Sequence, residues 1–278
     1  ILLRFIEERG VNKGQPVIVE AYQGCYRMGC YNIGENPTEI ILRKHANTAK
    51  LAEISKLENH PFDANLIRLL LPDTTAVRLI DISGDISLPR PEQLPETRYL
   101  AYGSSITNGS FSLIPSSTYT TRTAAGLGVD LINLGFGGGA HLEREIADYI
   151  AERKDWDFAT LEMGINLINK IEESDFDERV RYFINKISSL NPDKWIFCID
   201  LFTFREDYDP AAYRGKHFRE IVKKAVEDLN MPKVVHIDGR TLLRNASGLS
   251  PDLVHPTDSG FNEIAENLVK IIRTYINR

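Results

Sequence analysis

The pattern of hydrophobic and polar positions changes once along the chain. In the first part the apolar runs are short and of β type, and clusters of Gly, Pro, Asn and Asp separate them. These runs lie at 16–22, 39–44, 64–71 and 75–83. Short strands divided by frequent turn residues are typical of an antiparallel sandwich or a small jelly roll. The first part of the chain therefore predicts a small β domain.

A proline-rich stretch ends this part of the chain. Pro89, Pro91 and Pro95 lie within a few residues of one another. Because proline fixes φ and lacks a backbone donor, this density favours a stiff linker over a strand or a helix. We predict a domain boundary here, with a β-sandwich accessory domain and its linker over residues 1–95.

After this boundary, strand patterns alternate with longer helical patterns. The strand candidates are nearly continuous apolar runs, at 98–103, 130–136, 157–164, 194–202 and 233–238. The helical candidates lie at 116–127, 142–153, 175–190, 211–229 and 257–276. Apolar strands of this kind are expected where helices cover both faces of a parallel sheet. Residues 96–278 therefore predict an α/β domain with a doubly wound, mainly parallel, five-stranded sheet of flavodoxin-like type. In such sheets the site lies beyond the carboxyl ends of the strands.

Composition and charge narrow the class of protein. The chain has 278 residues, of which 42% are hydrophobic and 26% charged, as in ordinary soluble globular proteins. No apolar run approaches the roughly 20 residues that cross a bilayer. The formal net charge of -6 is spread without long runs of one sign, which argues against nucleic acid or a membrane as a partner. A small uncharged or weakly charged substrate fits better, and homo-oligomer formation stays open.

Cysteine usage bears on the compartment. Cys25, Cys30 and Cys198 cannot all pair within one chain, and Cys198 lies in an apolar run where a buried thiol is expected. A bridge between Cys25 and Cys30 stays open. Few cysteines and no secretory signal at the start favour a cytoplasmic location. Because the numbering starts at Ile1, a leader that has been removed stays an alternative.

A serine-bearing turn follows the first strand of the α/β domain. Residues 103–109 read Gly-Ser-Ser-Ile-Thr-Asn-Gly. Such a small-residue turn lets backbone amides approach a ligand and lets a serine hydroxyl point into the crevice. Taken alone, the turn is more simply explained as a glycine-serine loop that caps a helix. A catalytic serine also needs a base and an orienting acid.

An acid and a base appear together just before the last predicted helix. Asp252 precedes His255 by three residues, on a turn held by Pro251 and Pro256. This spacing can put the carboxylate beside the imidazole, where it fixes the tautomer and stabilises the imidazolium. Without the serine turn, the same two residues would be interpreted as a turn cap and a surface histidine. The two signals together are far more specific, and they predict a catalytic triad with Ser105.

Two further strand ends supply donors for an oxyanion. The second strand of the α/β domain ends in the glycine turn 135–139, whose backbone amides can face a developing negative charge. The third strand is followed by Asn166, whose side chain can donate to the same point. Each has a structural explanation as well, a glycine turn in one case and an asparagine in the left-handed conformation in the other. Their positions at successive strand ends favour the functional interpretation.

Taken in their order along the chain, these four segments resemble the sequence blocks of the SGNH (GDSL-like) hydrolases, and the resemblance covers about residues 98–278. The resemblance implies Ser105 as the nucleophile and as an amide donor. It implies Gly138 and Asn166 as the rest of the oxyanion hole, with His255 as base and Asp252 as its acid partner. A β-sandwich ahead of such a domain is similar to some carbohydrate esterases and to some acyltransferases that act on small molecules.

Two positions depart from the family pattern. Ser104 stands where Asp is common before the nucleophile, and Leu167 follows Asn166 where Asp is often found. Neither departure removes a member of the triad or of the oxyanion hole. Both put the subfamily, and with it the substrate, in question.

The other histidines and a glutamate in an apolar strand have simpler structural explanations. Five histidines outside the predicted triad, His45, His60, His141, His217 and His236, show no paired ligand spacing, which argues against a zinc site. Glu162 lies in an otherwise apolar strand, where a buried carboxylate needs a partner. We interpret Glu162 as structural, either paired or at a strand edge.

The sequence therefore predicts a serine esterase that cleaves small O-acyl esters through an acyl-serine intermediate, with no cofactor. The first candidate substrate is a carbohydrate that carries an O-acetyl group. One alternative is an acyltransferase that passes the acyl group to a small-molecule acceptor, because the same triad serves both reactions. The other is a catalytically inactive carbohydrate-binding protein, against which the complete set of site residues argues.

Overall fold

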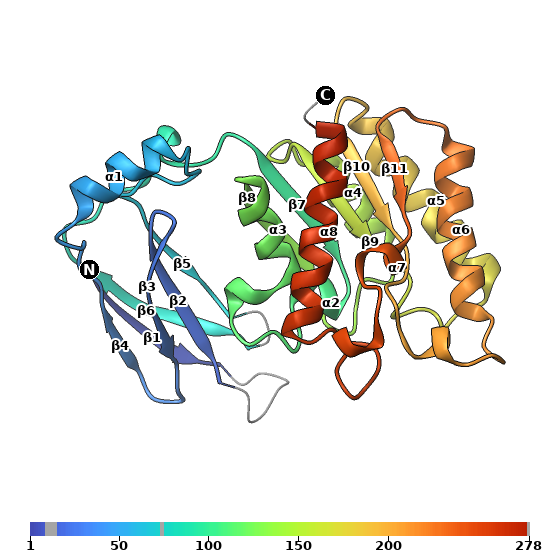
Figure 1. Cartoon of the computed structure of the whole chain (residues 1–278), viewed down its shortest axis with the longest axis horizontal. Coiled ribbons are helices and arrows are strands. Elements are labelled where there is room, and N and C mark those ends of the chain that lie inside the picture. Colours follow the sequence, from blue (N-terminus) through green and yellow to red (C-terminus); the bar gives the residue numbers. More distant parts are fainter. Residues whose placement is uncertain (9–15, 73–74, 277–278) are drawn as a thin grey trace. The chain divides into compact units, whose positions relative to one another are not determined.

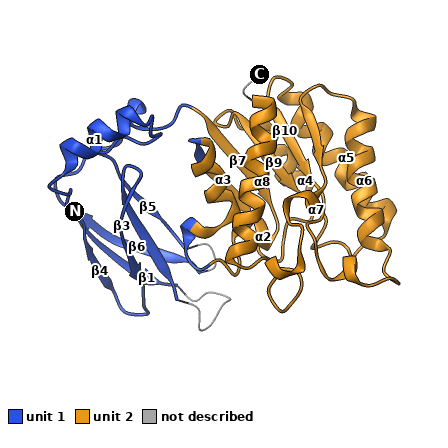
Figure 2. Cartoon of the chain, in the orientation of Figure 1, with its two compact units in different colours: residues 1–96, 113–116, 128–130 blue, residues 97–112, 117–127, 131–278 orange. Residues whose placement is uncertain are grey.

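Two structural units make up the chain in the computed structural model, which describes residues 1–8, 16–72 and 75–276 (Figure 2). The first unit comprises Ile1–Glu96, Leu113–Ser116 and Gly128–Asp130. The second unit comprises Thr97–Ser112, Ser117–Leu127 and Leu131–Arg278. The main division thus falls between Glu96 and Thr97, at the end of the proline-rich stretch.

The first unit contains two antiparallel sheets of three strands each. One has the order β4-β1-β6, formed by Thr38–Ile41, Leu2–Glu7 and Val77–Ser83. The other has the order β3-β2-β5, formed by Tyr26–Asn32, Ile18–Gln23 and Ile67–Leu70. Helix α1 spans Thr48–Leu57. The predicted small β domain is confirmed, although the sequence missed β1, β3 and α1.

Alternating side chains along the central strands build the core of this unit. On β1, Leu3 and Phe5 are buried, and on β2, Val19 and Ala21 are buried. Because successive side chains of a strand point to opposite faces, each pair lies on one face of its sheet. All four belong to a single apolar cluster, so the two sheets share one core.

The second unit is built on a five-stranded sheet of order β11-β10-β9-β7-β8. In that order the strands are Val234–Ile237, Trp195–Ile199, Phe158–Glu162, Arg98–Gly103 and Asp130–Gly135. The pairs β10–β11, β10–β9 and β7–β9 are parallel. Counted along this unit, the strand order is second, first, third, fourth and fifth, which is the predicted flavodoxin-like arrangement.

Helices cover both faces of this sheet (Figure 1). Helices α3 and α8 lie on one face, formed by Tyr119–Leu127 and Asp258–Ile276. Helices α4, α5 and α6 lie on the other, formed by Arg144–Glu152, Glu173–Leu190 and Arg214–Leu229. Two short helices, α2 (Ser105–Asn108) and α7 (Gly239–Leu242), follow β7 and β11. Single turns of 3-10 helix span Pro91–Gln93, Pro115–Ser117, Arg205–Tyr208 and Ala246–Gly248.

Aromatic side chains of β7 show why both faces need a cover. Tyr99 stacks on Phe158 of the neighbouring strand, with ring centroids 5.0 Å apart. Tyr102 lies on the opposite face, where its ring centroid is 4.6 Å from that of Phe183 on α5. All four side chains are buried, so the strand is apolar on both sides. The continuous apolar runs in the sequence therefore predicted the doubly wound arrangement correctly.

The strand order places a switch point between β7 and β9. In open α/β sheets, ligands bind beyond the carboxyl ends of the strands at such a point. Strand β7 ends at Gly103 and the adjacent β9 ends at Glu162. The segments that carry Ser105 and Asn166 therefore start from the same edge of the sheet.

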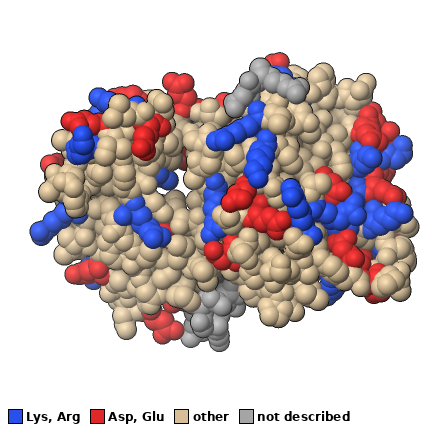
Figure 3. Space-filling view, viewed as in Figure 1, with Lys and Arg blue, Asp and Glu red and all other residues tan. Residues whose placement is uncertain are grey.

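Charged side chains of both signs share the surface, and the apolar segments are short. Over the described ranges, no helix combines the length and the apolar character needed to span a bilayer. On the face drawn in Figure 3, Lys and Arg side chains lie among Asp and Glu side chains. Arg181 of α5, for example, lies 2.8 Å from Asp177 and 3.0 Å from Asp228. Opposite charges thus pair locally on the helices of this unit.

The cysteines Cys25, Cys30 and Cys198 are free thiols, so the bridge that the sequence left open between Cys25 and Cys30 is not formed. Cys198 lies in β10 and is fully buried, as the apolar run predicted. Burial raises the pKa of its thiol well above the ordinary range.

Candidate active site

Ser105 lies on a sharp turn between a central strand and a short helix. Strand β7 ends at Gly103, Ser104 is the N-cap, and Ser105 is the first residue of α2. The Ser104 hydroxyl accepts a hydrogen bond from the Ile106 amide at 3.2 Å, as an N-cap side chain does. A Cβ at Gly103 would lie 2.1 Å from the Thr107 hydroxyl, so only glycine fits there. The turn thus holds Ser105 at the carboxyl edge of the sheet.

Ser105, His255 and Asp252 form one continuous line of hydrogen bonds. The Ser105 hydroxyl lies 2.8 Å from Nε2 of His255, and Nδ1 of His255 lies 2.6 Å from Oδ2 of Asp252. With a proton on Nδ1 held by the carboxylate, Nε2 is free to accept the serine proton. Ser105 is 9% exposed and the His255 side chain 21%, so the line is shielded without being sealed from solvent. The structure brings all three predicted residues together.

The turn around Asp252 explains the spacing of three residues. Its Oδ1 accepts hydrogen bonds from the amides of Val254 and His255, both at 2.9 Å, and from the Ser250 hydroxyl at 2.7 Å. Burial of the carboxylate opposes its charge, but hydrogen bonds led by that of His255 outweigh burial and hold the pKa of Asp252 well below its usual range. Asp252 is therefore an anion at any pH at which an imidazole titrates.

A loop after β10 contacts the turn that carries Asp252 and His255. The amide of Arg205 donates to the carbonyl of Leu253 at 2.8 Å. Leu253 itself has φ +56, in the left-handed region that leucine seldom adopts. The Thr203 hydroxyl donates to the carbonyl of Leu243, which anchors the same loop to the segment that leads to the turn. The position of His255 thus depends on a neighbouring loop as well as on its own turn.

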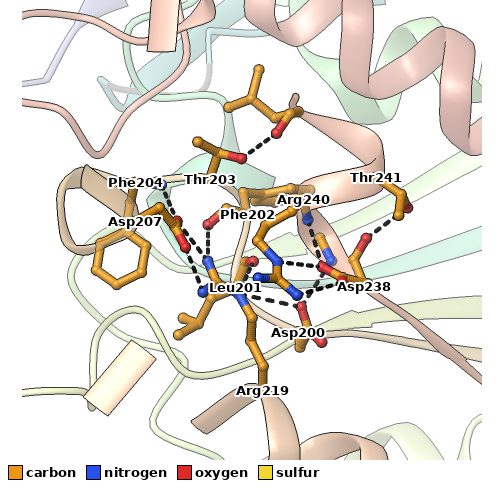
Figure 4. A network of polar contacts seen from close by, with 12 residues as sticks. Asp200, Leu201, Phe202, Thr203, Phe204, Asp207, Arg219, Asp238, Arg240 and Thr241 are labelled. Carbon is orange, nitrogen blue, oxygen red and sulfur yellow. Dashed lines mark hydrogen bonds and ion pairs between the residues drawn. The ribbon is translucent and has the colours of Figure 1, made fainter. Parts of the chain in front are cut away.

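A buried arginine of α6 fixes that loop (Figure 4). Arg219 is 6% exposed, and its guanidinium donates to both oxygens of Asp207 at 2.8 Å. It also donates to the carbonyls of Leu201 and Phe202, at 3.0 and 2.9 Å. The guanidinium therefore makes four hydrogen bonds inside the protein, which offset the cost of burying its charge. Arg219 was not predicted from the sequence, although an arginine on the buried stripe of an amphipathic helix is a visible signal.

Asp200 extends the network on the side of the sheet. Its carboxylate accepts a hydrogen bond from the Gly239 amide at 2.8 Å and lies 2.7 Å from Nε2 of His236. Arg219 lies 3.9 Å away. Burial raises the pKa of Asp200, and the hydrogen bonds from His236 and Gly239 offset part of that rise. His236 is thus a partner of a buried acid, and over the described ranges no group of three or more His, Cys, Asp or Glu side chains could hold a metal ion.

Besides Ser105, the two residues predicted for the oxyanion hole lie on turns that contact each other. Gly138 has φ +72, and a Cβ there would meet no atom within 4 Å, so its backbone conformation, not space, requires glycine. The side-chain amide of Asn166 donates to the carbonyl of Gly139 at 2.5 Å. One of its two N–H groups is used in this way, which leaves a second donor. The contact ties the glycine turn to the loop after β9, and the roles of Gly138 and Asn166 towards an oxyanion stay predictions.

Glu162 has a more specific place than the sequence indicated. It is 1% exposed, at the end of the central strand β9, and its Oε2 accepts hydrogen bonds from the Ser104 amide at 2.6 Å and the Thr107 hydroxyl at 3.2 Å. The Thr107 hydroxyl in turn lies 2.6 Å from that of Tyr119. Burial raises the pKa of Glu162, and the hydrogen bonds from Ser104 and Thr107 oppose that rise. Of the two alternatives, paired or at a strand edge, the carboxylate is paired, and it holds the turn that carries Ser105.

The sheet has the flavodoxin-like order, and a serine on a strand-to-helix turn meets a histidine and an aspartate from the C-terminal part of the chain. This combination is typical of the SGNH hydrolases. Residues 96–273 match the model of the GDSL-like Lipase/Acylhydrolase family. Because this match covers well over half of the chain, the protein belongs to that family. A comparison with curated protein sequences gave no match.

Solved structures of similar fold extend over both units. A protein described as a GDSL-like lipase from Bacteroides ovatus is 19% identical, with a TM-score of 0.76 over 99% of this chain and 81% of that one. A salicylyl-acyltransferase from a tetracycline biosynthetic pathway is 19% identical, with a TM-score of 0.68 over 99% of this chain and 80% of the acyltransferase. A family two carbohydrate esterase from Clostridium thermocellum, solved in complex with cellohexaose, is 14% identical. Its TM-score is 0.66 over 99% of this chain and 89% of the esterase. At these identities the likeness concerns the fold.

Proposed function

We propose that the second unit is a catalytic domain that cleaves small O-acyl esters through an acyl-serine intermediate. The observation that carries this proposal is the hydrogen-bonded line from Ser105 through His255 to Asp252. Family membership supports hydrolysis as the reaction class. The first unit is proposed as an accessory domain that supplies no reacting group, because every residue of the proposed site lies after residue 96.

The reaction follows the chemistry of these groups. His255 takes the proton of Ser105, whose oxygen attacks the ester carbonyl carbon to give a tetrahedral intermediate. His255 then gives the proton to the leaving alcohol oxygen as the bond between carbon and that oxygen breaks. Water, deprotonated by His255 in the same way, releases the acid and restores Ser105. Asp252 stays ionised throughout and stabilises the imidazolium, and no cofactor enters the reaction.

Stabilisation of the oxyanion is assigned to three groups. The backbone amides of Ser105 and Gly138 and the side-chain amide of Asn166 are the proposed donors. The contact between Asn166 and the Gly139 carbonyl supports this assignment, because it fixes the amide beside the glycine turn. Prearranged donors of this kind act on the charge that develops in the transition state and need no reorganisation during the reaction.

The substrate that the fold and its relatives favour is a carbohydrate ester with a small acyl group such as acetyl. Structures of similar fold include a carbohydrate esterase that binds cellohexaose. The second candidate function is acyl transfer to a small-molecule acceptor, which the likeness to a salicylyl-acyltransferase supports. Both reactions share the acyl-serine intermediate and differ in whether water or an alcohol removes the acyl group.

One assay separates these functions. Release of p-nitrophenol from short-chain acyl esters is followed with the full chain, with and without candidate alcohol acceptors. We expect hydrolysis without acceptor, fastest for acetyl. Release that depends on an acceptor, with an acylated acceptor as product, would select the transferase. No release from any ester, with an accompanying affinity for oligosaccharides, would select the inactive binding protein.

A further inference from the structure

An exposed aromatic side chain lies directly on the base of the proposed triad. The ring of Phe111 stacks on the imidazole of His255, with ring centroids 4.9 Å apart and an angle of 27° between the planes. Phe111 is 53% exposed, so its contact with the protein leaves much of the residue open to solvent. A large apolar side chain that stays exposed beside reacting groups gains little from burial in the free protein.

The backbone of Phe111 makes this placement costly. Its φ of +75 lies in the left-handed region, which residues with a bulky side chain rarely adopt. Hydrogen bonds of the surrounding loop hold it there, from the Ser110 amide to the Ser105 carbonyl at 2.9 Å and from the Ser112 amide to the Gly109 carbonyl at 2.8 Å. Strain that the surroundings maintain, at a residue that contributes little burial, points to a functional role for the ring.

The geometry of acyl transfer says which part of an ester this ring meets. The imidazole that takes the serine proton later donates it to the leaving alcohol oxygen, so that oxygen must come within hydrogen-bond reach of His255 Nε2. The acyl chain, by contrast, is attached to the carbonyl carbon that becomes bound to Ser105. A ring stacked on His255 therefore borders the alcohol part of the ester.

From this geometry, and on the basis of the proposed function, we propose that Phe111 binds the leaving alcohol of the ester and selects alcohols that present a flat apolar ring face. A pyranose and a cyclohexyl ring share this chemistry, since both can place C–H groups on an aromatic face. In a transfer reaction the acceptor alcohol attacks along the reverse path, so it occupies the same place. The acyl group does not contact Phe111.

The test compares esters that change one part at a time, with the full chain. Ethyl acetate, cyclohexyl acetate and a methyl glycoside with one O-acetyl group share the acyl group and differ in the alcohol. Cyclohexyl acetate and cyclohexyl butyrate share the alcohol and differ in the acyl group. The variants are Phe111→Gly, which removes the ring and suits a positive φ, Phe111→Tyr, which keeps the ring face, and Tyr213→Ala as a control. Tyr213 is 57% exposed, similar to Phe111, and lies at the start of α6 against His217.

We expect Phe111→Gly to lower kcat/KM about tenfold for the two cyclic alcohol esters, mainly through KM, and to change that for ethyl acetate by less than about twofold. In Phe111→Gly, the ratio of kcat/KM between cyclohexyl acetate and cyclohexyl butyrate stays as in the wild type. Phe111→Tyr keeps the wild-type preference for the cyclic alcohol esters, and Tyr213→Ala leaves kcat/KM for all esters unchanged. A loss confined to the glycoside or to the cyclohexyl ester identifies which ring is bound.

Two outcomes overturn the proposal in distinguishable ways. An equal loss for all esters in Phe111→Gly, with lowered kcat, would show that Phe111 only positions His255. An unchanged preference for cyclic alcohols in Phe111→Gly would show that the ring does not touch the alcohol. Absence of ethyl acetate hydrolysis by the wild-type protein would instead refute the proposed esterase function itself.

Discussion

The carboxylate of Glu162 accepts a hydrogen bond from the backbone amide of Ser104, 2.6 Å away, directly before the proposed nucleophile. Glu162 ends β9 and Ser104 follows β7, so the contact joins the ends of two adjacent strands at the switch point of the sheet. The same oxygen holds Thr107 on the other side of Ser105. A buried acid thereby clamps both flanks of the serine turn.

Glu162 predicts a specific pH dependence of stability. Burial raises its pKa in the folded state, so between the unfolded value, ordinarily near 4.3, and the folded value the native protein binds more protons than the unfolded chain. The free energy of unfolding therefore loses a contribution as pH rises through that window. In Glu162→Gln this loss disappears, while Gln can still accept from the Ser104 amide. Urea unfolding of both proteins from pH 4 to 8 measures the difference, and curves that run parallel would contradict the prediction.

Replacement of the proposed nucleophile is the direct test of the proposed triad. Ser105→Ala removes the attacking oxygen and leaves the fold intact, so we expect kcat to fall by about three or more orders of magnitude. Ser104→Ala is the matched control, because it removes the hydroxyl that caps α2 at the Ile106 amide and keeps the backbone amide that Glu162 holds. Kinetics with a p-nitrophenyl ester compare the two variants. If Ser104 proved essential and Ser105 dispensable, the register of the motif would be wrong.

Local patterns in the sequence were enough for the five-stranded sheet and for the turn that carries Asp252 and His255, because both depend on short-range signals. Apolar runs and their spacing predicted all five strands of the second unit, and Asp252 and His255 lie on one turn. Contacts between distant segments were out of reach. Strand β3 contains Gly29 and exposed polar residues, so its strand character comes from pairing with β2, which the local pattern does not show.

The same limit applies to the site. The sequence showed that a carboxylate at Glu162 needs a partner but could not name Ser104, which is 58 residues away. The stacking of Phe111 on His255 depends on a loop with an unusual φ, for which phenylalanine gives no local signal. Asn166 was predicted as a donor, and only the structure shows that it also ties its loop to the glycine turn through the Gly139 carbonyl.

Asn166 combines a proposed oxyanion role with this structural contact, and kinetics can separate the two. We expect Asn166→Ala to cost about 2.7–4 kcal/mol of transition-state stabilisation, chiefly in kcat, since the donor matters most once charge has developed. Loss of the bond to the Gly139 carbonyl adds a small decrease in thermal stability, of about 1 kcal/mol. Steady-state kinetics and thermal unfolding are measured together. A change confined to KM would assign Asn166 to substrate binding or to the turn.

The buried ion pair of Arg219 predicts a specific effect on stability. Arg219→Met removes the guanidinium that binds Asp207, so that carboxylate loses its ion-pair partner and the carbonyls of Leu201 and Phe202 lose this donor. We expect a loss of about 3–5 kcal/mol in the free energy of unfolding. The double variant Arg219→Met, Asp207→Leu is the control, and we expect it to recover much of that loss because no unpaired charge remains. Urea unfolding of the single and double variants measures both, and equal losses would contradict a role for the ion pair.

Asp252 allows the triad to be tested by pH, because the pKa of its carboxyl lies well below the usual range in the folded protein. It stays ionised from pH 5 to 9, so it cannot produce an acid limb in kcat/KM there, whereas the imidazole that must be neutral to accept the Ser105 proton can. We expect kcat/KM of the wild type to fall on the acid side of this range. Asp252→Asn keeps the size of the side chain but removes its charge and favours the wrong tautomer of His255, so we expect a decrease of about 10⁴-fold that persists where the imidazole is neutral.

Ser250→Ala is the matched control for this substitution. It removes one hydrogen bond to Oδ1 of Asp252 and leaves the bond to His255 in place, so we expect a decrease of less than about tenfold. The profiles of kcat/KM from pH 5 to 9 are measured for the wild type and both variants, with a parallel series in chelator. A flat acid limb in the wild type would remove histidine as the base. Activity that chelator abolishes and zinc restores would replace the triad with a metal-dependent mechanism, since a serine activated by His255 and Asp252 needs no metal ion.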